Sequence, residues 1–223
     1  MRDSSLIGAI WTKRNRFQVG NAQLQGFREI QSNYFSSANN DTGELFLVLA
    51  DGAVDNLSGR RAAVIAVNHC ILAFNRGKLS TPDAESMCNI AIAANVRIRE
   101  EIYLGTRPHV SLTMVLFTNE GLHCFNVGDN KIYFYNKHNE QEPIYSADNL
   151  FFYGRFELPP KRNLVGIYSN GVHTVTHPME RMKAVALKKR TANDKAQSLI
   201  ECIKKKNLTN QLNATALLVE VVK

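Results

Sequence analysis

Short apolar runs dominate the first fifty residues of the chain. The run Glu44–Ala50 is almost continuously apolar, which is typical of a strand buried on both faces. Earlier apolar or alternating runs predict three further strands, at Ile7–Trp11, Phe17–Gln23 and Gln31–Ser36. The stretch Ser37–Gly43 is rich in Ser, Asn, Asp and Gly, and it predicts a turn or loop before the buried strand.

The hydrophobic period then changes to that of helices. Between Ser58 and Arg76, apolar residues recur at steps of three and four, and Gly77 offers a stop. These residues are Val64, Val67, Ile71 and Phe74. A second helix is predicted to begin with Thr81 as N-cap and Pro82 at its first position. Its apolar face consists of Met87, Ala91, Ala94, Ile98 and Ile102.

Strand patterns return after the helices. The runs are Val110–Phe117, Leu122–Val127 and Lys131–Tyr135. The tight turns between them, at Asn119–Gly121 and Gly128–Asn130, predict an antiparallel meander. After them we expect an irregular surface loop in Asn136–Arg162 and a strand at Asn163–Ser169. The region Met179–Lys206 is predicted to be mostly helical, with one apolar face that consists of Ala196, Leu199, Ile200 and Ile203. A final strand is predicted at Asn213–Val222.

The order of these elements indicates the fold class. Strands and helices are segregated along the chain rather than strictly alternating, which favours an α+β protein with antiparallel sheets covered by helices over a doubly wound nucleotide-binding fold. The sequence contains neither a Gly-x-Gly-x-x-Gly motif nor a phosphate-binding Gly-Lys-Ser/Thr loop. No linker is long enough to divide the 223 residues, so we expect one domain spanning residues 1–223.

The chain carries a net charge of +7, part of it in two runs, Lys188–Arg190 and Lys204–Lys206. Such an excess can indicate nucleic acid or an anionic membrane. The runs lack interleaved aromatic residues or a nucleic-acid motif, which favours a solvated surface and argues against nucleic acid as the partner.

Targeting signals and cysteines point to the compartment. The N-terminal apolar stretch is too short for a signal peptide, and no run of about 18 apolar residues occurs. The four cysteines form no Cys-x-x-Cys pair, so a zinc site is not expected. Cys70, Cys88 and Cys124 fall within predicted helices or strands and are expected to be buried thiols in a reducing compartment. We therefore expect a soluble cytoplasmic protein without a membrane partner.

Four polar stretches occur in a fixed order along the chain. They are Arg28–Phe35; Leu49–Gly52 followed by Ser58–Ala63; Asn126–Lys131; and Tyr168–Gly171 together with Gln211–Thr215. Together they resemble the motifs of the PPM-type (type 2C) metal-dependent serine/threonine phosphatases, in compact bacterial form. The resemblance covers nearly the whole chain and implies a four-layer αββα sandwich, with two central antiparallel sheets flanked by helices. The segment between Asp129 and Asn170 is shorter than in many relatives.

The resemblance also implies a chemistry and assigns roles to residues. In that family two divalent ions, Mn²⁺ or Mg²⁺, are bound by carboxylates and activate a bridging water that attacks phosphorus. By position, Asp51 corresponds to the carboxylate that bridges both metals, and Gly52 contributes its carbonyl. Arg28 corresponds to the arginine that binds phosphate. Asp129 corresponds to an aspartate that some relatives use for an additional metal.

Several ligand positions depart from the family pattern. Ser32, Asn33 and Asn170 stand where acidic residues are typical, and Leu212, which offers no ligand atom, replaces an aspartate. These changes remove about three negative charges from a site that must offset four positive ones, so at most one Mn²⁺ or Mg²⁺ ion is expected. Asp55 stands where the family has glycine; it either replaces a lost ligand or forms a local hydrogen bond in a turn.

Two functions remain open from the sequence. The first is a pseudophosphatase, a domain with a degenerate metal site that acts in signalling by binding a protein, for example a phosphoprotein. The alternative is an active but divergent Mn²⁺- or Mg²⁺-dependent serine/threonine phosphatase that hydrolyses phosphomonoesters.

Overall fold

The computed structural model describes residues 16–52, 57–102, 109–136, 144, 151–160, 163–186 and 190–222. Within these residues the strands form two antiparallel sheets. The four-stranded sheet has the order β1 (Phe17–Leu24), β9 (Ala214–Val221), β8 (Leu164–Tyr168), β6 (Lys131–Tyr135). The five-stranded sheet has the order β2 (Asn33–Asn39), β3 (Leu45–Gly52), β4 (Val110–Phe117), β5 (Leu122–Val127), β7 (Phe151–Phe156).

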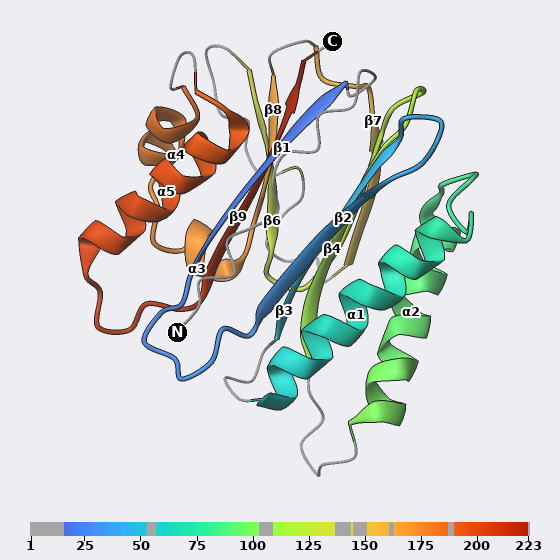
Figure 1. Ribbon diagram of the computed structural model, residues 1–223, viewed down its shortest axis with the longest axis horizontal. Helices are drawn as coiled ribbons and strands as arrows, with labels where there is room; N and C mark the ends of the chain where they lie inside the picture. The colour runs from blue at the N-terminus through green and yellow to red at the C-terminus, as the bar shows by residue number, and fades with distance from the viewer. Residues whose placement is uncertain are drawn as a thin grey trace.

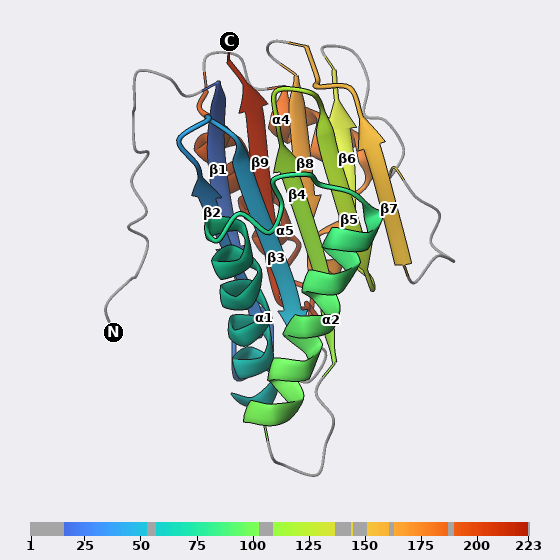
Figure 2. The same cartoon turned by 90° about the vertical axis from the view of Figure 1, so that its right-hand side faces the viewer.

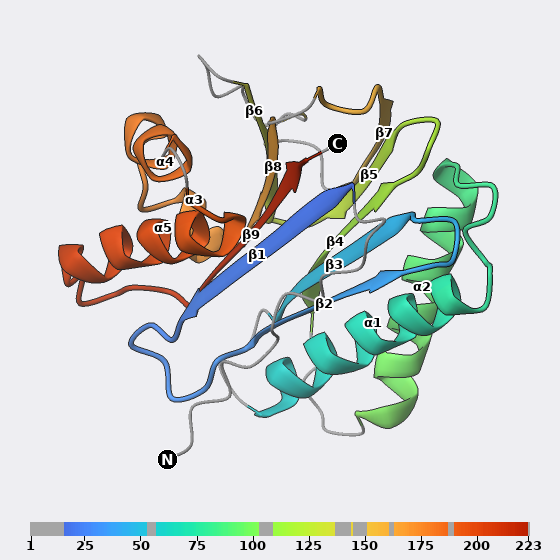
Figure 3. The same cartoon turned by 45° about the horizontal axis from the view of Figure 1, so that its top comes forward.

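Helices cover the outer face of each sheet. Figure 1 shows α1 (Leu57–Asn75) and α2 (Ala84–Glu101) on one side of the molecule, and α4 (Pro178–Val185) and α5 (Ala192–Lys206) on the other, with the two sheets between them. The short helix α3 (Asn170–His173) follows β8. In Figure 2, α1 and α2 lie in front of the five-stranded sheet, and Figure 3 shows both helical layers with the sheets separating them. The expected αββα sandwich is confirmed.

Strand β3 shows how one sequence run contributes to two layers of the core. Its odd-numbered leucines pack between the two sheets, and Phe46, Val48 and Ala50 pack toward α1 and α2. All six residues from Leu45 to Ala50 are buried. This arrangement confirms the strand predicted to be buried on both faces, because successive side chains of a strand point to opposite sides.

The buried face of α1 differs from the predicted one. Val67 and Phe74 are buried as expected, but Val64 and Ile71 are only half-buried. Most of the buried face consists of small residues: Gly59, Ala62, Ala63, Ala66, Cys70 and Ala73. Small side chains let α1 approach the sheet closely; a Cβ added at Gly52 would lie 2.4 Å from the Gly59 carbonyl oxygen. The period of large apolar residues therefore misplaced the contact face.

The N-terminus of α2 lies two residues later than predicted. Asp83, not Thr81, is the N-cap: its carboxylate accepts from the Ser86 N–H at 2.7 Å, and the Ser86 hydroxyl oxygen accepts from the Asp83 N–H at 3.0 Å. This reciprocal capping box satisfies two N–H groups, which a cap at Thr81 with proline following it would not do. The predicted apolar face of α2 is largely correct, with Ile90 buried where Ala91 is only half-buried.

The predicted meander is interrupted after β5. β4 and β5 form the expected hairpin, but β5 pairs next with β7, and β6 pairs with β8 in the other sheet. The turn Gly128–Asn130 thus carries the chain from one sheet to the other. β7 was not predicted: it lies in the segment Asn136–Arg162, expected to be irregular, and its half-exposed position at the edge of the sheet gives it little apolar alternation.

The edge strand β2 also departs from the prediction. It runs over Asn33–Asn39 rather than Gln31–Ser36, so the first three residues of the predicted loop Ser37–Gly43 belong to the strand. An edge strand is held by its backbone ladder to β3 and does not require apolar side chains on its exposed positions. The predicted strand Ile7–Trp11 lies outside the described residues.

The C-terminal third follows the sequence closely. The helical region Met179–Lys206 contains α4 and α5, and the four predicted apolar residues of α5 are all buried. None of the described helices has both the length and the apolar character needed to cross a membrane.

Cys70 and Cys124 are buried free thiols, as predicted, and burial raises the pKa of Cys70 to about 12. Cys88 is only half-buried, contrary to the prediction.

Candidate functional site

The layer between the two sheets changes from apolar to polar at one end of the sandwich. The same alternation that places leucines and valines between the sheets continues into polar residues there. On the five-stranded sheet these residues are Asn33, Asp51, Ser111, Thr113 and Asn126; on the four-stranded sheet they are Gln23, Ser169, Asn213 and Thr215. All four motif stretches of the sequence contribute to, or adjoin, this end.

Asn33 and Asn213 join the two sheets. The Asn33 Nδ2 donates to the Asn213 carbonyl at 3.2 Å and to the Thr215 hydroxyl at 3.1 Å. The Asn213 Nδ2 donates to the Ile30 carbonyl at 2.7 Å and to the Ser32 hydroxyl at 3.1 Å. The Asn213 Oδ1 accepts from the Gly26 N–H at 3.1 Å. Ser32 and Asn33, which the resemblance matched to acidic positions, thus belong to a neutral network of amides and hydroxyls.

Ser169 and Thr215 extend this network along the four-stranded sheet. The Ser169 hydroxyl oxygen accepts from the Thr215 N–H at 2.9 Å, and its O–H donates to the Asn213 carbonyl at 3.4 Å. The Thr215 hydroxyl also accepts from Gln23 Nε2 at 2.9 Å. Ser169, Asn213 and Thr215 are all buried. Buried polar groups of this kind are stable only when paired, and here nearly all are.

Asp51 ends β3 beside this network. In the ladder it lies opposite Asn33 on β2 and opposite Ser111 on β4, and it is half-buried. The Gly52 N–H donates to the Ser32 carbonyl at 3.4 Å. The structure therefore places Asp51, Gly52, Ser32 and Asn33 side by side, as the order of the motifs implied.

Asp129 reaches the same region through Ser111. The Ser111 hydroxyl oxygen accepts from the Asp129 N–H at 3.0 Å. Gly128 has a φ of 91° and fits closely over Ser111, since an added Cβ would lie 2.4 Å from the hydroxyl oxygen. Asp129 itself is exposed. Both aspartates thus adjoin Ser111 through their backbones, Asp51 by strand pairing and Asp129 by the turn that crosses between the sheets.

His173 of α3 contacts the same turn. Its Nε2 lies 3.0 Å from the Asp129 carbonyl oxygen and must carry the hydrogen, because a carbonyl only accepts. Burial is the main cause that lowers the pKa of His173, and the charge of Lys131 acts in the same direction. The neutral imidazole is therefore favoured, and it ties α3 to the turn.

Arg28 lies on the connection between β1 and β2, which the network holds in place. The Phe27 N–H donates to the Gln211 carbonyl at 3.0 Å, and the Gln25 Nε2 donates to the Arg28 carbonyl at 2.8 Å. Gly26 fits so closely that an added Cβ would lie 2.0 Å from the Gln211 carbonyl oxygen. The exposed Arg28 is thus anchored beside the segment that carries Leu212 and Asn213.

A second arginine, Arg60 of α1, is part of the structural support. Its Nη1 donates to the Asn33 carbonyl, and its guanidinium lies 4.8 Å from the centroid of the Tyr34 ring. Burial lowers the pKa of Arg60 below its ordinary value. This arginine fixes α1 against β2 behind the site, a role that the sequence motifs did not reveal.

Asn170 begins α3, whose position is set from both ends. Gly171 packs on Asn213, where an added Cβ would lie 2.3 Å from the carbonyl oxygen, and Gln211 Nε2 donates to the Gly171 carbonyl at 3.0 Å. Leu212 is half-buried between Gln211 and Asn213. The positions of Asn170 and Leu212, though 42 residues apart in number, therefore lie in contacting segments.

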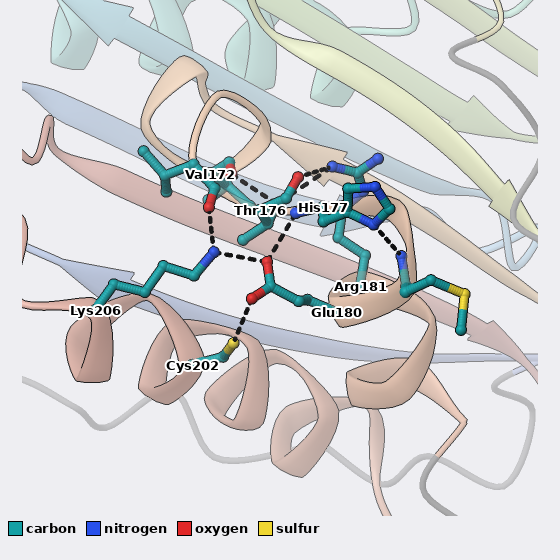
Figure 4. Close-up of polar contacts among 9 residues, drawn as sticks. Val172, Thr176, His177, Glu180, Arg181, Cys202 and Lys206 are labelled. Atoms are coloured by element: carbon teal, nitrogen blue, oxygen red, sulfur yellow. Dashed lines mark hydrogen bonds and ion pairs between the residues drawn. The ribbon is translucent and has the colours of Figure 1, made fainter.

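Cationic side chains hold the chain that follows α3 (Figure 4). Lys206 of α5 donates to the Val175 carbonyl at 2.5 Å and to Glu180 at 2.6 Å, and Arg181 donates to the Thr176 carbonyl at 2.6 Å. Lys206 is also the main cause that lowers the pKa of Glu180. Carbonyls after a helix have no partner within it, and these cations satisfy them. We call Lys206, Glu180 and Arg181 the clamp. It fixes α3, and with it Asn170, against the sheet.

Among the residues that the structure describes, the donor set does not fit a pair of divalent ions. The described residues contain no group of three or more His, Cys, Asp or Glu side chains arranged to hold a metal. Asn213 uses both ends of its amide within the protein, and Leu212 offers no donor. Asn33 Oδ1 is a buried acceptor without a hydrogen-bond partner in the described part of the chain, and Asn33 lies opposite Asp51 in the ladder between β2 and β3. Asp55 lies outside the described residues.

The sequence motifs missed part of this site. Asn213, Thr215 and Ser169 lie within or beside the motif stretches but were given no role, and Ser111 and Gln211 were not singled out. The alternation of side chains along a strand could have revealed Asn213, Thr215 and Ser169. Each lies at or next to the end of a strand, at a position that points to the same side as the strand's buried apolar residues. A polar residue at such a position must have a partner across the sheets.

The fold has close counterparts among solved structures. The serine/threonine phosphatase of S. agalactiae superposes with a TM-score of 0.74 at 15% identity, covering 92% of this chain and 99% of that one. The serine/threonine phosphatase Stp1 of Staphylococcus aureus gives a TM-score of 0.73 at 15% identity, with 92% and 95% covered. The catalytic domain of the phosphatase PstP, solved in complex with two manganese ions, gives 0.70 at 16% identity, with 93% and 99% covered.

These similarities are structural. The sequence matches no protein-family model and no curated protein. Identities of this order between chains that superpose over nearly their full length establish a common fold and leave the chemistry to the residues of the site. The two sheets, their helical layers and the polar end of the layer between them show that this chain has the fold of the bacterial PPM-type serine/threonine phosphatases.

Proposed function

We propose that this protein is a pseudophosphatase: a PPM-type phosphatase domain that binds a protein partner, in particular a phosphoprotein, without hydrolysing it. The observation that carries the proposal is the neutral network at Asn33 and Asn213, which occupies the region where a two-metal site needs carboxylates. A single carboxylate at the end of β3 does not offset two dications a few ångströms apart, because their mutual repulsion is strong.

The network also supports the proposal by making a metal unnecessary for folding. Asn33, Asn213 and Thr215 tie the two sheets together with hydrogen bonds of 2.7 to 3.2 Å. Repelling carboxylates at these positions would need metal ions to hold the sheets together. The amides join the sheets at this end without a metal, which fits a domain retained for binding. At most one Mn²⁺ or Mg²⁺ ion would bind, on Asp51 and the Gly52 carbonyl.

Arg28 is the residue that would contact the phosphate. Its loop is anchored through Gly26 and Phe27 to the Gln211–Asn213 segment, so its position does not depend on a metal. A guanidinium binds two phosphate oxygens with its planar fork. Partner binding in the cytoplasm, as part of a signalling pathway, is the role we assign to such a site.

The proposal is tested by metal-dependent hydrolysis and by binding of the same phosphopeptides. We expect no Mn²⁺-dependent release of phosphate above that of the Asp51→Ala variant. A variant with two restored carboxylates, Asn170→Asp with Leu212→Asp, serves as the matched control and should bind Mn²⁺ more tightly in calorimetry than the natural chain. Robust turnover by the natural chain that Asp51→Ala abolishes would overturn the proposal.

The alternative is an active phosphatase with one ion or a rearranged pair. The observation that favours it is the juxtaposition of Asp51 and Asp129 on either side of Ser111. It predicts that Asp51→Ala and Asp129→Ala both abolish Mn²⁺-dependent turnover. Absence of Mn²⁺ binding at millimolar concentration would exclude it.

A further inference from the structure

Strand β7 is an edge strand with an aromatic surface. It pairs with β5 on one side, and among the described residues no strand pairs with its other side. Figure 2 shows β7 at the outer edge of the sheet. Phe151 is 48% exposed, and Arg155 is exposed as well. Edge strands are commonly protected from further pairing by lysine, by proline or by a bulge. β7 contains neither lysine nor proline, and its ladder to β5 runs without a bulge.

The ladders show which backbone groups of β7 point away from β5. At the turn between β4 and β5, the Thr118 N–H donates to the Gly121 carbonyl at 2.9 Å, so these two residues form a hydrogen-bonded pair. Bonded and non-bonded pairs alternate along an antiparallel ladder. Followed through β5 into β7, this alternation turns the N–H and C=O groups of Phe151, Tyr153 and Arg155 outward. We call these outward groups the β7 edge.

We propose that the β7 edge pairs with the same edge of a second copy of this chain, in an antiparallel ladder centred on Tyr153. In this register Tyr153 faces its own equivalent, and Phe151 faces Arg155 of the second copy. Each outward N–H group of one copy then has an outward carbonyl of the other as its acceptor. The pairing is closed by a two-fold axis, as in most soluble dimers.

The side chains favour a second copy over a strand of another protein. Phe151 and Arg155 lie on the same face of β7, because they are four residues apart in a strand. Across the axis each guanidinium would lie beside the facing Phe151 ring, and this cation–π contact forms twice by symmetry. A strand of different sequence would supply the hydrogen bonds without these matched contacts.

The charge at the β7 edge also permits self-pairing. The whole chain carries a net charge of +7, which opposes the approach of two copies. Arg155, however, is paired with Glu120 of its own chain at 3.4 Å. The excess positive charge is therefore not concentrated at this edge, and like charges would not face each other across the axis.

Such a dimer would join two five-stranded sheets edge to edge. Two-fold pairing reverses the direction of the strands, so the polar ends of the two copies, each marked by Asp51, would lie at opposite ends of the joined sheet. Each dimer would thus present two candidate sites that face away from each other. The inference goes beyond the proposed function and does not depend on it.

Analytical ultracentrifugation over a range of protein concentrations tests the proposal. Two six-residue strands bury less surface than a standard interface, so we expect a dissociation constant on the order of 10–100 µM. Phe151→Arg, which sets like charges opposite each other, should abolish the dimer. Arg155→Glu should weaken it by about 5- to 30-fold, because both cation–π contacts are lost. The double variant should dimerise again, because opposite charges then face each other.

The matched control is Ser37→Arg, which adds the same charge at an exposed position of β2, the opposite edge strand of the same sheet. It should leave the dimer unchanged. A natural chain that stays monomeric up to its highest soluble concentration would overturn the proposal, and so would a dimer that survives Phe151→Arg. A double variant that dimerises no better than Phe151→Arg alone would overturn the register centred on Tyr153.

Amide hydrogen exchange measured by NMR locates the pairing. The N–H groups of Tyr153 and Arg155 should exchange about tenfold more slowly in the natural chain than in Phe151→Arg when about nine-tenths of the natural chain is dimeric. The N–H group of Gly154, which points to β5, should change less. Equal protection of Tyr153 and Arg155 in both proteins would mean that the chain itself covers the edge. Fast exchange in both would leave the edge to another protein, and either result would overturn self-pairing.

Discussion

The two ends of the layer between the sheets belong to the same strands but are held together by different interactions. Over most of its length the layer consists of leucines and valines such as Leu47, Leu49 and Val219, whose contacts have no direction. At the other end the same alternation places Asn33 and Asn213, whose hydrogen bonds hold at 2.7 to 3.2 Å. The apolar end provides most of the stability, and the polar end sets the position of the loops that surround the candidate site.

The largest expected effect is at the apolar end. Leu49→Ala removes a fully buried side chain between the sheets and leaves a cavity, which should lower the free energy of unfolding by about 3–5 kcal/mol. Urea denaturation measures it. Since Leu49 packs in the apolar part of the layer, phosphopeptide binding should be unchanged under conditions where the variant is folded. Loss of binding in a folded variant would mean that the two ends are not independent.

At the polar end, the stability lost on substitution should depend on how many buried groups are left without a hydrogen-bond partner. Asn213→Leu leaves the Gly26 N–H and the Ile30 carbonyl without their partner, at an expected cost of about 2–3 kcal/mol. Asn33→Leu should cost about 1 kcal/mol or less, because Thr215 still accepts from Gln23 and the Asn213 carbonyl still accepts from Ser169. Urea denaturation of both variants gives the comparison. Equal losses would show that the network acts as a unit rather than through Asn213.

The smallest expected effect concerns the clamp behind α3. The contact with Lys206 holds the pKa of Glu180 below its ordinary range. A carboxyl group with a depressed pKa in the folded state contributes stability that is present at neutral pH and is lost as pH falls below about 5. The ion pair is partly exposed, so Glu180→Gln should cost about 1 kcal/mol or less at pH 7. The difference from the natural chain in urea denaturation should shrink as the pH falls through the lowered pKa of Glu180; a difference that does not change with pH would show that the ion pair does not cause it.

Most of the fold could be predicted from the sequence. The run Glu44–Ala50 and the faces of α2 and α5 carry strong periodic signals, and the structure confirms them. The edge strands β2 and β7 carry weak signals, because their backbones are held by one neighbour and their side chains are partly exposed. The face of α1 was misplaced because alanine and glycine, which make the closest contact, contribute little to a hydrophobic period.

The candidate site could be predicted only in outline. The structure brings Asp51, Gly52, Ser32 and Asn33 together, as the motif order implied, and the roles assigned to them, to Leu212 and to Asn170 stay predictions. It did not reveal that Asn213 joins the two sheets or that Ser111 lies between Asp51 and Asp129. Those contacts link residues whose sequence separation is 18 to 183, and local pattern does not specify such pairings.

The sequence by itself determined the layers of this protein and the chemistry available at one end of them. Apolar alternation fixes which side chains are buried, and the polar groups available at one end are a matter of residue identity. Only the tertiary structure decided how the polar residues at that end pair: they form a neutral network that spans the two sheets and anchors the loop of Arg28. The physical reason is that burial is a property of single residues along the chain, whereas a buried hydrogen bond depends on which distant partner the fold supplies.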